Sequence, residues 1–292
     1  MKYLAPLFAC LVLISCSHPK KVNKNDLETL HYKGKVKAVA YNVYKAIEKD
    51  GKIEKGTVVN KLQTNCNQDG YFVEQSTFKG DKLYYRIIHR YDSTNTLIEQ
   101  IRVQQAVVYM SQGNTRPDSM SESHVTYSYL RDKNGNKIET KVMHDGKQQY
   151  RDENKFDLRG NIIELNEYIP WDTLQRREVC KYDDKDNMIE KRGYLPNGKM
   201  IFKYTFQYNA SGNMTEMDSY KADSTLELKE EMKYDDKGNK ISDTRVMADG
   251  TKNFDWRFEF KEFDKEGNWI KEISYRDNKP EAITERLLEY YK

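Results

Sequence analysis

The sequence has few of the features that mark an enzyme or a metal protein. Its five histidines are scattered, with no His-Glu-x-x-His motif and no close pair at ligand spacing, so a zinc site is unsupported. It has neither a Gly-x-Ser-x-Gly elbow nor a glycine loop that could cradle phosphate. Its many carboxylates are expected in turns and on polar strand faces, where solvation explains them better than a glycosidase pair does. We therefore expect a protein with no enzymatic activity, no cofactor and no metal.

An excess of charge of one sign is also missing. The 49 Lys and Arg residues and 46 Asp and Glu residues are interspersed, and the net charge of +3 forms no basic stripe. Nucleic acid is therefore not an expected partner. Hydrophobic residues make up 37% and charged residues 33%, which is polar for a globular core. A thin sheet with one apolar face, or a narrow superhelix, fits this composition better than a thick two-layer domain.

Long hydrophobic runs are confined to the first few residues. The apolar run Leu4 to Ile14 follows Lys2 and is too short for a transmembrane helix, so it predicts a secretion signal. The stretch Leu13-Ile14-Ser15-Cys16 resembles the bacterial lipobox, in which the signal is cut before the cysteine. This resemblance implies that residues 1–15 are a signal peptide and that Cys16 is acylated; the alternative is an ordinary signal with an incidental cysteine. Two or three acyl chains would hold the protein firmly to a membrane.

The residues after Cys16 bear on its destination. Residues 16–25 have no apolar periodicity and are expected to form a solvated tether. Ser17 rather than Asp follows the cysteine, which by analogy with sorting rules argues against retention at the inner membrane. No acidic cluster of the kind that favours surface display follows either. We expect a lipid anchor in the outer membrane facing the periplasm, with surface display left open.

What the sequence does have is a repeated motif. Copies of a Tyr-Asp-x-x-Gly-Asn pattern begin at positions 91, 131, 156, 182, 208, 234 and 263, in steps of 40, 25, 26, 26, 26 and 29 residues. Its Asp, Asn and Gly residues tolerate the positive φ of a hairpin turn. A second turn signal lies about halfway through each copy, so each copy predicts two strands. The copy at Asp132-Lys133-Asn134-Gly135-Asn136 has oxygen donors in alternation, but lacks the flanking helices and the acidic twelfth position of a calcium loop.

Apolar positions within the copies predict the faces of the strands. Phe202, Tyr204, Phe206 and Tyr208 alternate with polar residues and are expected on one face. We take two further sets, three and eight residues after the Gly position, as buried anchors, on opposite faces or across a bulge. The first set is Ile98, Ile138, Ile163, Ile189, Thr215, Ile241 and Ile270. The second set is Val103, Met143, Tyr168, Tyr194, Tyr220, Val246 and Tyr275.

The predicted fold is all-β. Isolated hairpins are marginally stable, so neighbouring copies must complete one another as a long antiparallel meander. About fourteen strands exceed what an open sheet holds without coiling, so it should twist strongly or wrap into a superhelical or barrel-like body. We divide the chain into a signal (1–15), a tether (16–25), an N-terminal β capping region (26–90) and a repeat region (91–292). The step of 40 residues includes a polar run at 111–119, expected to be a loop.

Two cysteines remain after the leader and its anchor. Cys66 and Cys180 lie 114 residues apart, which is several repeats in a linear stack. A secreted chain permits a disulfide. Because Cys180 falls where Phe206 falls in the next copy, we expect a buried free thiol rather than a bridge.

The motif resembles the YD repeats of the RHS class, in the form found in lipoproteins of Bacteroidota. The resemblance covers residues 91 to 275, about two thirds of the chain. It implies β-sheet strips, which in long arrays spiral into shells around toxin cargo, and similar repeats have been linked to carbohydrate binding. Seven copies are too few to enclose cargo, and no toxin-like tail follows Ile283.

Two functional hypotheses follow. The first is an envelope lipoprotein that acts as a non-enzymatic binding or scaffold module, with a protein or glycan partner on the sheet face. The second is a carbohydrate-binding protein, because Trp171, Trp256 and Trp269 with rows of Tyr could stack on sugar rings. A core role for these aromatics is the preferred reading. Clustering of the three tryptophans on an exposed concave face would favour sugar binding, and burial of all three a structural module.

Overall fold

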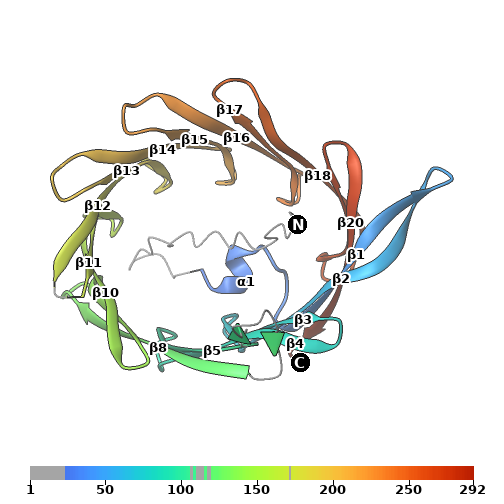
Figure 1. Cartoon of the computed structure of the whole chain (residues 1–292), viewed down its shortest axis with the longest axis horizontal. Helices are drawn as coiled ribbons and strands as arrows, with labels where there is room; N and C mark the ends of the chain where they lie inside the picture. The colour runs from blue at the N-terminus through green and yellow to red at the C-terminus, as the bar shows by residue number, and fades with distance from the viewer. Residues whose placement is uncertain (1–23, 106–107, 110–114, 117–119, 171) are drawn as a thin grey trace.

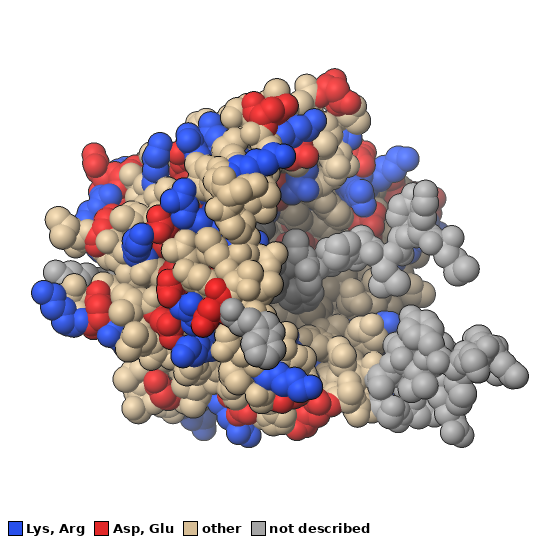
Figure 2. Space-filling model, turned by 60° about the vertical axis from the view of Figure 1, so that its left-hand side comes forward, with Lys and Arg blue, Asp and Glu red and all other residues tan. Residues whose placement is uncertain are grey.

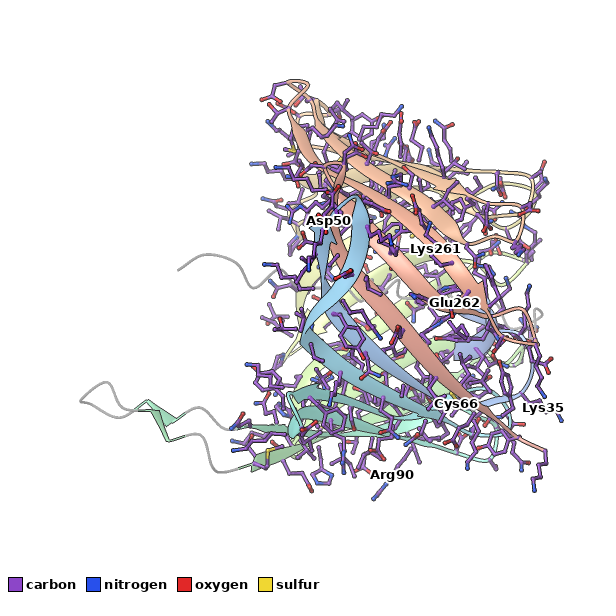
Figure 3. All side chains as sticks on the ribbon, turned by 90° about the vertical axis from the view of Figure 1, so that its right-hand side faces the viewer. Lys35, Asp50, Cys66, Arg90, Lys261 and Glu262 are labelled. Carbon is purple, nitrogen blue, oxygen red and sulfur yellow. The ribbon has the colours of Figure 1, made fainter. Side chains whose placement is uncertain are left out.

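A computed structural model gives the architecture of the chain, and it describes residues 24–105, 108–109, 115–116, 120–170 and 172–292. Eighteen antiparallel strands form one sheet whose last strand pairs with its first, so the sheet is a closed ring (Figure 1). Each strand pairs with its neighbours in the sequence, as in a simple meander. The short strands β6 (Val108–Tyr109) and β7 (Thr115–Arg116) pair only with each other, and they extend beyond one rim of the ring (Figure 3).

The elements follow one another in chain order. One helical turn, α1, comes first and spans Asp26–Thr29. The strands are β1 Val36–Lys49, β2 Lys52–Cys66, β3 Phe72–Lys79, β4 Lys82–Tyr91, β5 Leu97–Gln105, β6 Val108–Tyr109, β7 Thr115–Arg116, β8 Met120–Arg131, β9 Lys137–His144, β10 Lys147–Phe156, β11 Ile162–Ile169, β12 Thr173–Tyr182, β13 Met188–Tyr194, β14 Met200–Tyr208, β15 Met214–Tyr220, β16 Leu226–Tyr234, β17 Lys240–Met247, β18 Lys252–Phe263, β19 Trp269–Arg276 and β20 Lys279–Tyr290. None of the helices in the described part of the chain is long and apolar enough to cross a membrane.

The all-β antiparallel prediction is confirmed. Of the shapes that the sequence left open, the barrel-like body is the one found, because the sheet closes and is not an open twisted or curled meander. The closing seam joins β1 to β20 over nine residue pairs, from Val36↔Tyr290 to Lys45↔Ala282. Residues 36–91, expected as a cap, form four strands of this same ring. Closure removes the two unpaired edges that an open sheet would expose to other chains.

The register of paired residues shows which side chains face out. Arg90, Lys261 and Glu262 point away from the barrel in Figure 3, whereas Cys66 packs against Leu27 of α1 inside it. Directly paired residues share a face, and along one strand the face alternates. The ladder that starts at Arg90↔Glu99 therefore carries the assignment from strand to strand around the ring.

Buried apolar clusters are small in this fold. One lies inside the ring, where Leu27 of α1 meets Val39 and Cys66. The other lies on the outer face at the seam, where Ile273 packs against Ile283. Eighteen strands at about 4.8 Å spacing and about 40° tilt enclose a ring roughly 35 Å across, which is too wide for side chains to fill. In the part of the chain that the structure describes, the inner wall is therefore a surface and not the side of a packed core.

The prediction of two sets of buried anchors needs correction. The first set faces inward and the second outward, but Ile98, Ile163 and Ile189 are 37–39% exposed. They stand next to the motif turns on the inner rim, where the ring is too wide for a partner to cover them. In the second set Tyr275 is buried, with 8% of its surface exposed, and the other members are half-buried. Further buried positions on the strands include Val142 and Leu165. The final strand, β20, is an interior strand of the ring, because it pairs with β19 on one side and β1 on the other.

Candidate binding surface on the inner wall

The repeated motif is a hairpin turn held by its own aspartate. In the copy at 183–187, Asp183 Oδ1 accepts the backbone N–H groups of Lys185 and Asn187 at 2.9 and 2.8 Å. Asp183 Oδ2 accepts the Asn187 side-chain amide at 2.9 Å. The Gly position has positive φ, and Asp186 adopts it at 65° where glycine is missing. The same contacts recur at 132–136, whose carboxylate is thus engaged by the turn.

The motif tyrosine joins one hairpin to the one before it. Between hairpins the strands separate near the motif turns; the β13–β14 ladder, for example, ends at Glu190↔Thr205. The Tyr208 hydroxyl spans this gap and donates to the carbonyl of Met188 at 2.9 Å. Tyr182 and Tyr234 make the same bond, each to a carbonyl 20 residues earlier, also at 2.9 Å. This tyrosine therefore satisfies a carbonyl that the diverging strands leave unpaired.

Rows of aromatic side chains line the inner wall. On β14 the rings of Phe202 and Tyr204 lie 5.2 Å apart and those of Tyr204 and Phe206 lie 6.4 Å apart. On β18 the rings of Trp256 and Phe258 stack 6.2 Å apart at 8°. These side chains are half-buried, because one side of each ring packs against the wall and the other side faces the lumen. Four strand spacings separate the two rows, or about 19 Å.

The two tryptophans in the described residues share one outcome. Trp256 and Trp269 lie on the concave inner wall and are half-buried, so the expectation of a closed aromatic core is not met for them. Trp269 packs against Phe260 at 5.4 Å, and the Arg286 guanidinium lies 3.3 Å from its ring centroid. Trp171 lies outside the described residues.

Between the aromatic rows the inner wall carries charge. Arg245 binds Glu230, and Lys240 lies 2.5 Å from Asp243. Both carboxylates are buried, with 8% of each residue exposed. Burial raises the pKa of Glu230, and the nearby negative charge of Asp243 adds to the effect against the pull of Arg245.

A second group of inward charges lies on β11 to β13. Glu178 is only 4% exposed at its side chain and is held by Lys191 at 2.6 Å and Arg176 at 3.1 Å. Nearby on β10, burial raises the pKa of Asp152 to about 6, helped by the charge of Glu167. From the sequence, carboxylates were predicted in turns and on polar strand faces, and these buried inward ones were not identified. Their position could have been predicted, because Glu178 and Glu230 each stand four positions before a motif tyrosine and so share its face.

The outer wall has a different character. Positive and negative side chains are intermixed over it, and the surface is hollowed where the ring opens (Figure 2). Pairs across neighbouring strands include Lys181–Glu190 at 2.9 Å and Lys271–Glu262 at 3.2 Å. Near the rim opposite the motif turns, tyrosines lie beneath cations of the adjacent strand. These pairs are Arg151 over Tyr168, Arg177 over Tyr194, Lys203 over Tyr220 and Arg257 over Tyr275.

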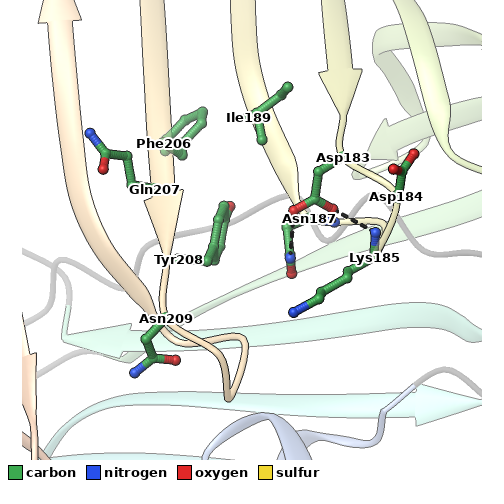
Figure 4. A pocket seen from close by; sticks show the side chains of 9 residues that line it. All are labelled: Asp183, Asp184, Lys185, Asn187, Ile189, Phe206, Gln207, Tyr208 and Asn209. Carbon is green, nitrogen blue, oxygen red and sulfur yellow. Dashed lines mark hydrogen bonds between the residues drawn. The ribbon is translucent and has the colours of Figure 1, made fainter.

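A pocket of about 280 Å³ opens at the inner rim between two motif turns (Figure 4). Ile189, Phe206 and Tyr208 form its apolar sides. Turn residues supply its polar edge, namely Asp183, Asp184, Lys185, Asn187 and Asn209. It lies where β13 and β14 diverge, at the end of the β14 aromatic row.

The remaining candidate residues have simple outcomes. Cys66 and Cys180 are both buried, and no disulfide joins them, as expected. Cys16, the tether up to residue 23 and the polar run 111–119, apart from Thr115–Arg116, lie outside the described residues. Within the described ranges no group of three or more His, Cys, Asp or Glu residues could hold a metal ion.

Comparisons with known proteins do not assign this chain to a family. Neither models of protein families nor curated proteins match this chain. Among solved structures, a porin-like protein from Bacteroides uniformis shares 9% identity, with 88% of this chain and 99% of that chain covered and a TM-score of 0.45. A porin-like protein from Bacteroides vulgatus shares 10% identity, with 88% and 98% covered and a TM-score of 0.35. The Tc holotoxin pore of Photorhabdus luminescens shares 15% identity over 75% of this chain and 13% of that chain, with a TM-score of 0.27.

Proposed function

We propose that this chain is a lipid-anchored cell-envelope protein that acts as a non-enzymatic binding module through the inner wall of its ring. The observation that carries the proposal is the pair of half-buried aromatic rows, Phe202 to Phe206 on β14 and Trp256 to Phe260 on β18. Apolar side chains facing a lumen too wide to fill remain available to a ligand. In the described part of the chain, only α1 and the residues next to it lie inside the ring (Figure 1).

The charged outer wall is the argument for a barrel that faces water and is held at the membrane by an anchor. A charged side chain on a lipid-facing strand costs about 2–4 kcal/mol at the bilayer midplane. Here ion pairs such as Lys181–Glu190 and Lys229–Glu216 cover the outside of the strands. An acyl group on Cys16 would hold such a body at the outer membrane without inserting it.

A carbohydrate is the second candidate, and the inner wall favours it. Pyranose rings have apolar faces that stack on aromatics and hydroxyl edges that need carboxylates, amides or cations nearby. The inner wall provides both kinds of group, with Glu230 and Arg245 between the two aromatic rows. A peptide partner would use the same aromatic rings but would not need the charged residues Glu230 and Arg245 between the two rows.

A glycan array and a pull-down screen on the full chain, purified in detergent, would test binding. The Trp256→Ala and Phe258→Ala variants should each lose most of the binding, while Tyr194→Ala on the outer wall should retain it. Equal loss from the inner and outer variants, or binding unaffected by either, would rule out the inner wall. Capture of a protein instead of a glycan would favour the first candidate over the second.

Anchoring is tested separately at Cys16. The Cys16→Ala variant should move from the membrane fraction to the soluble fraction, and metabolic labelling with a fatty acid should disappear. Cys66→Ala is the matched control and should leave both unchanged. A Cys16→Ala protein that stays in the membrane fraction would show that something other than an acyl group holds it there.

A further inference from the structure

The pocket between the motif turns differs from the equivalent gaps around the ring. At each gap two strands diverge, and the side chain two positions before the motif tyrosine faces inward beside it. That position is Phe206 in this gap, but Cys180 and Met232 in the neighbouring copies, both of which are buried. Across the gap stands Ile189, 39% exposed, where the next copy has Thr215. The flat ring and the isoleucine thus form two apolar sides of an open pocket.

We propose that this pocket binds one pyranose unit at the end of a glycan whose chain lies along the β14 aromatic row. The inference deepens the carbohydrate candidate given above and rests on it. At about 280 Å³ the pocket is at the small end of ligand sites, which suits one ring and not an oligosaccharide. The row from Phe202 to Tyr208 covers six residue-to-residue steps along the strand, about 20 Å, and ends at the pocket.

The polar edge of the pocket fits the hydroxyl groups of a sugar. Asp183 and Asn187 are fixed by their mutual bonds in the turn and form a rigid side. Asp184 and Lys185 are exposed, so they offer an acceptor and a donor to the ligand. In Figure 4 the Lys185 side chain extends from the turn toward the gap below Asn187. A ligand here meets rings on one side and charged groups on the other.

Saturation-transfer NMR on the full chain in detergent tests the pocket, with methyl glucopyranoside, methyl galactopyranoside and methyl N-acetylglucosaminide as probes. At least one probe should receive saturation from the protein. Phe206→Ala should weaken its affinity about fivefold or more, because the stacking surface is removed. Asp184→Ala, an exposed change that leaves the fold intact, should weaken it as well.

The repeat supplies a matched control. Asp236, two copies further along the chain, holds the place that Asp184 holds here and is likewise exposed, so Asp236→Ala should leave binding unchanged. Equal loss in both variants, or pyranoside binding that survives Phe206→Ala, would overturn the pocket. If longer glycans bind the inner wall and no single pyranose does, the pocket fails while the proposed function stands. If no sugar of any length binds, the carbohydrate candidate and the pocket fail together.

Discussion

At the scale of single residues, the motif tyrosine is explained by one carbonyl group. In six gaps the carbonyl after a motif turn accepts a bond from the next hairpin, and the donor changes where the tyrosine is absent. Phe156 stands in the tyrosine position of its copy, and there the Asn154 side chain donates to the carbonyl of Lys137 at 3.0 Å. On β20 the Arg286 guanidinium reaches the Trp269 carbonyl at 2.8 Å. The carbonyl, more than the phenol, is therefore the fixed feature of the repeat.

Removing one such hydroxyl should have a measurable cost. Tyr208→Phe leaves the Met188 carbonyl without its donor, and we expect a loss of about 1 kcal/mol in the free energy of unfolding. Denaturant melts followed by circular dichroism would measure it. Asn154→Ala should lose a similar amount, since the Asn154 amide donates the equivalent hydrogen bond to the Lys137 carbonyl.

Phe156→Tyr is the informative control for this account. The Lys137 carbonyl that a tyrosine at this position would reach already accepts a hydrogen bond from Asn154, so an added hydroxyl should not stabilise the protein. A gain equal to the loss in Tyr208→Phe would show that the phenol acts in some other way.

One inward carboxyl predicts a pH dependence. Burial raises the pKa of Glu272 from 4.5 to about 7, against the nearby positive charge of Arg286. The folded protein thus holds this proton more tightly than the unfolded chain, so stability falls as pH rises from about 4.5 to about 7. Glu272→Gln should remove this fall and be more stable at pH 8 by up to about 3 kcal/mol, from about 1.4 kcal/mol per pKa unit. Thermal melts from pH 4 to pH 8 would show it.

Glu259 on the outer wall provides the opposite sign. Bonds from Lys261 and Arg257 lower its pKa to about 2, so its contribution is present at neutral pH and lost as pH falls from 4.5 toward 2. Glu259→Gln should therefore be destabilised at pH 7, where Glu272→Gln is stabilised. A shift in the same direction for both would contradict the assignment of inner and outer faces.

At the scale of elements, the two-residue period of the strands could be predicted from the sequence. Which side chains on a face are buried could not. Phe202, Tyr204, Phe206 and Tyr208 share a face as predicted. The isoleucines after the turns, however, were predicted to be buried, whereas in the structure they lie along the open inner rim. Burial depends on what lies opposite a side chain, and only the width of the ring decides that.

One pairing within a hairpin is unusually tight. Gly193 on β13 faces Phe202 on β14, and a Cβ on the glycine would lie 2.3 Å from the phenylalanine ring. Gly193→Ala should destabilise the protein by about 1–3 kcal/mol through overpacking. In the double variant Gly193→Ala/Phe202→Leu the smaller side chain should recover part of that loss, as a double-mutant cycle would show. Strictly additive losses would mean that the two side chains do not meet.

At the scale of the whole molecule, closure is what the sequence could not supply. Periodicity predicted hairpins and their order, but the seam joins Val36 to Tyr290, which no local pattern connects. The inner pocket needs the same knowledge, because it depends on which strands diverge and on the empty space beyond them. Only the residue types at its edge, Phe206 and the motif turn, could be marked beforehand.

The seam can be tested with a cross-link. Ala40 and Leu287 are paired across it on the outer face, so Ala40→Cys/Leu287→Cys should form a disulfide on mild oxidation. A non-reducing gel would show a faster, monomeric band for most of the protein. Ala40→Cys/Ile201→Cys, with the second cysteine on a strand far around the ring, should give none. An open sheet would leave both variants uncross-linked.

The seam also restricts how such a molecule can change over time. In an antiparallel ring, neighbouring strands must run in opposite directions all the way round, so the total must be even, and here it is eighteen. Gain or loss of genetic material can therefore preserve closure only in whole hairpins, about 26 residues at a step. Duplication of one copy would widen the bore and shift which side chains meet across it, while a single added strand would break the circle.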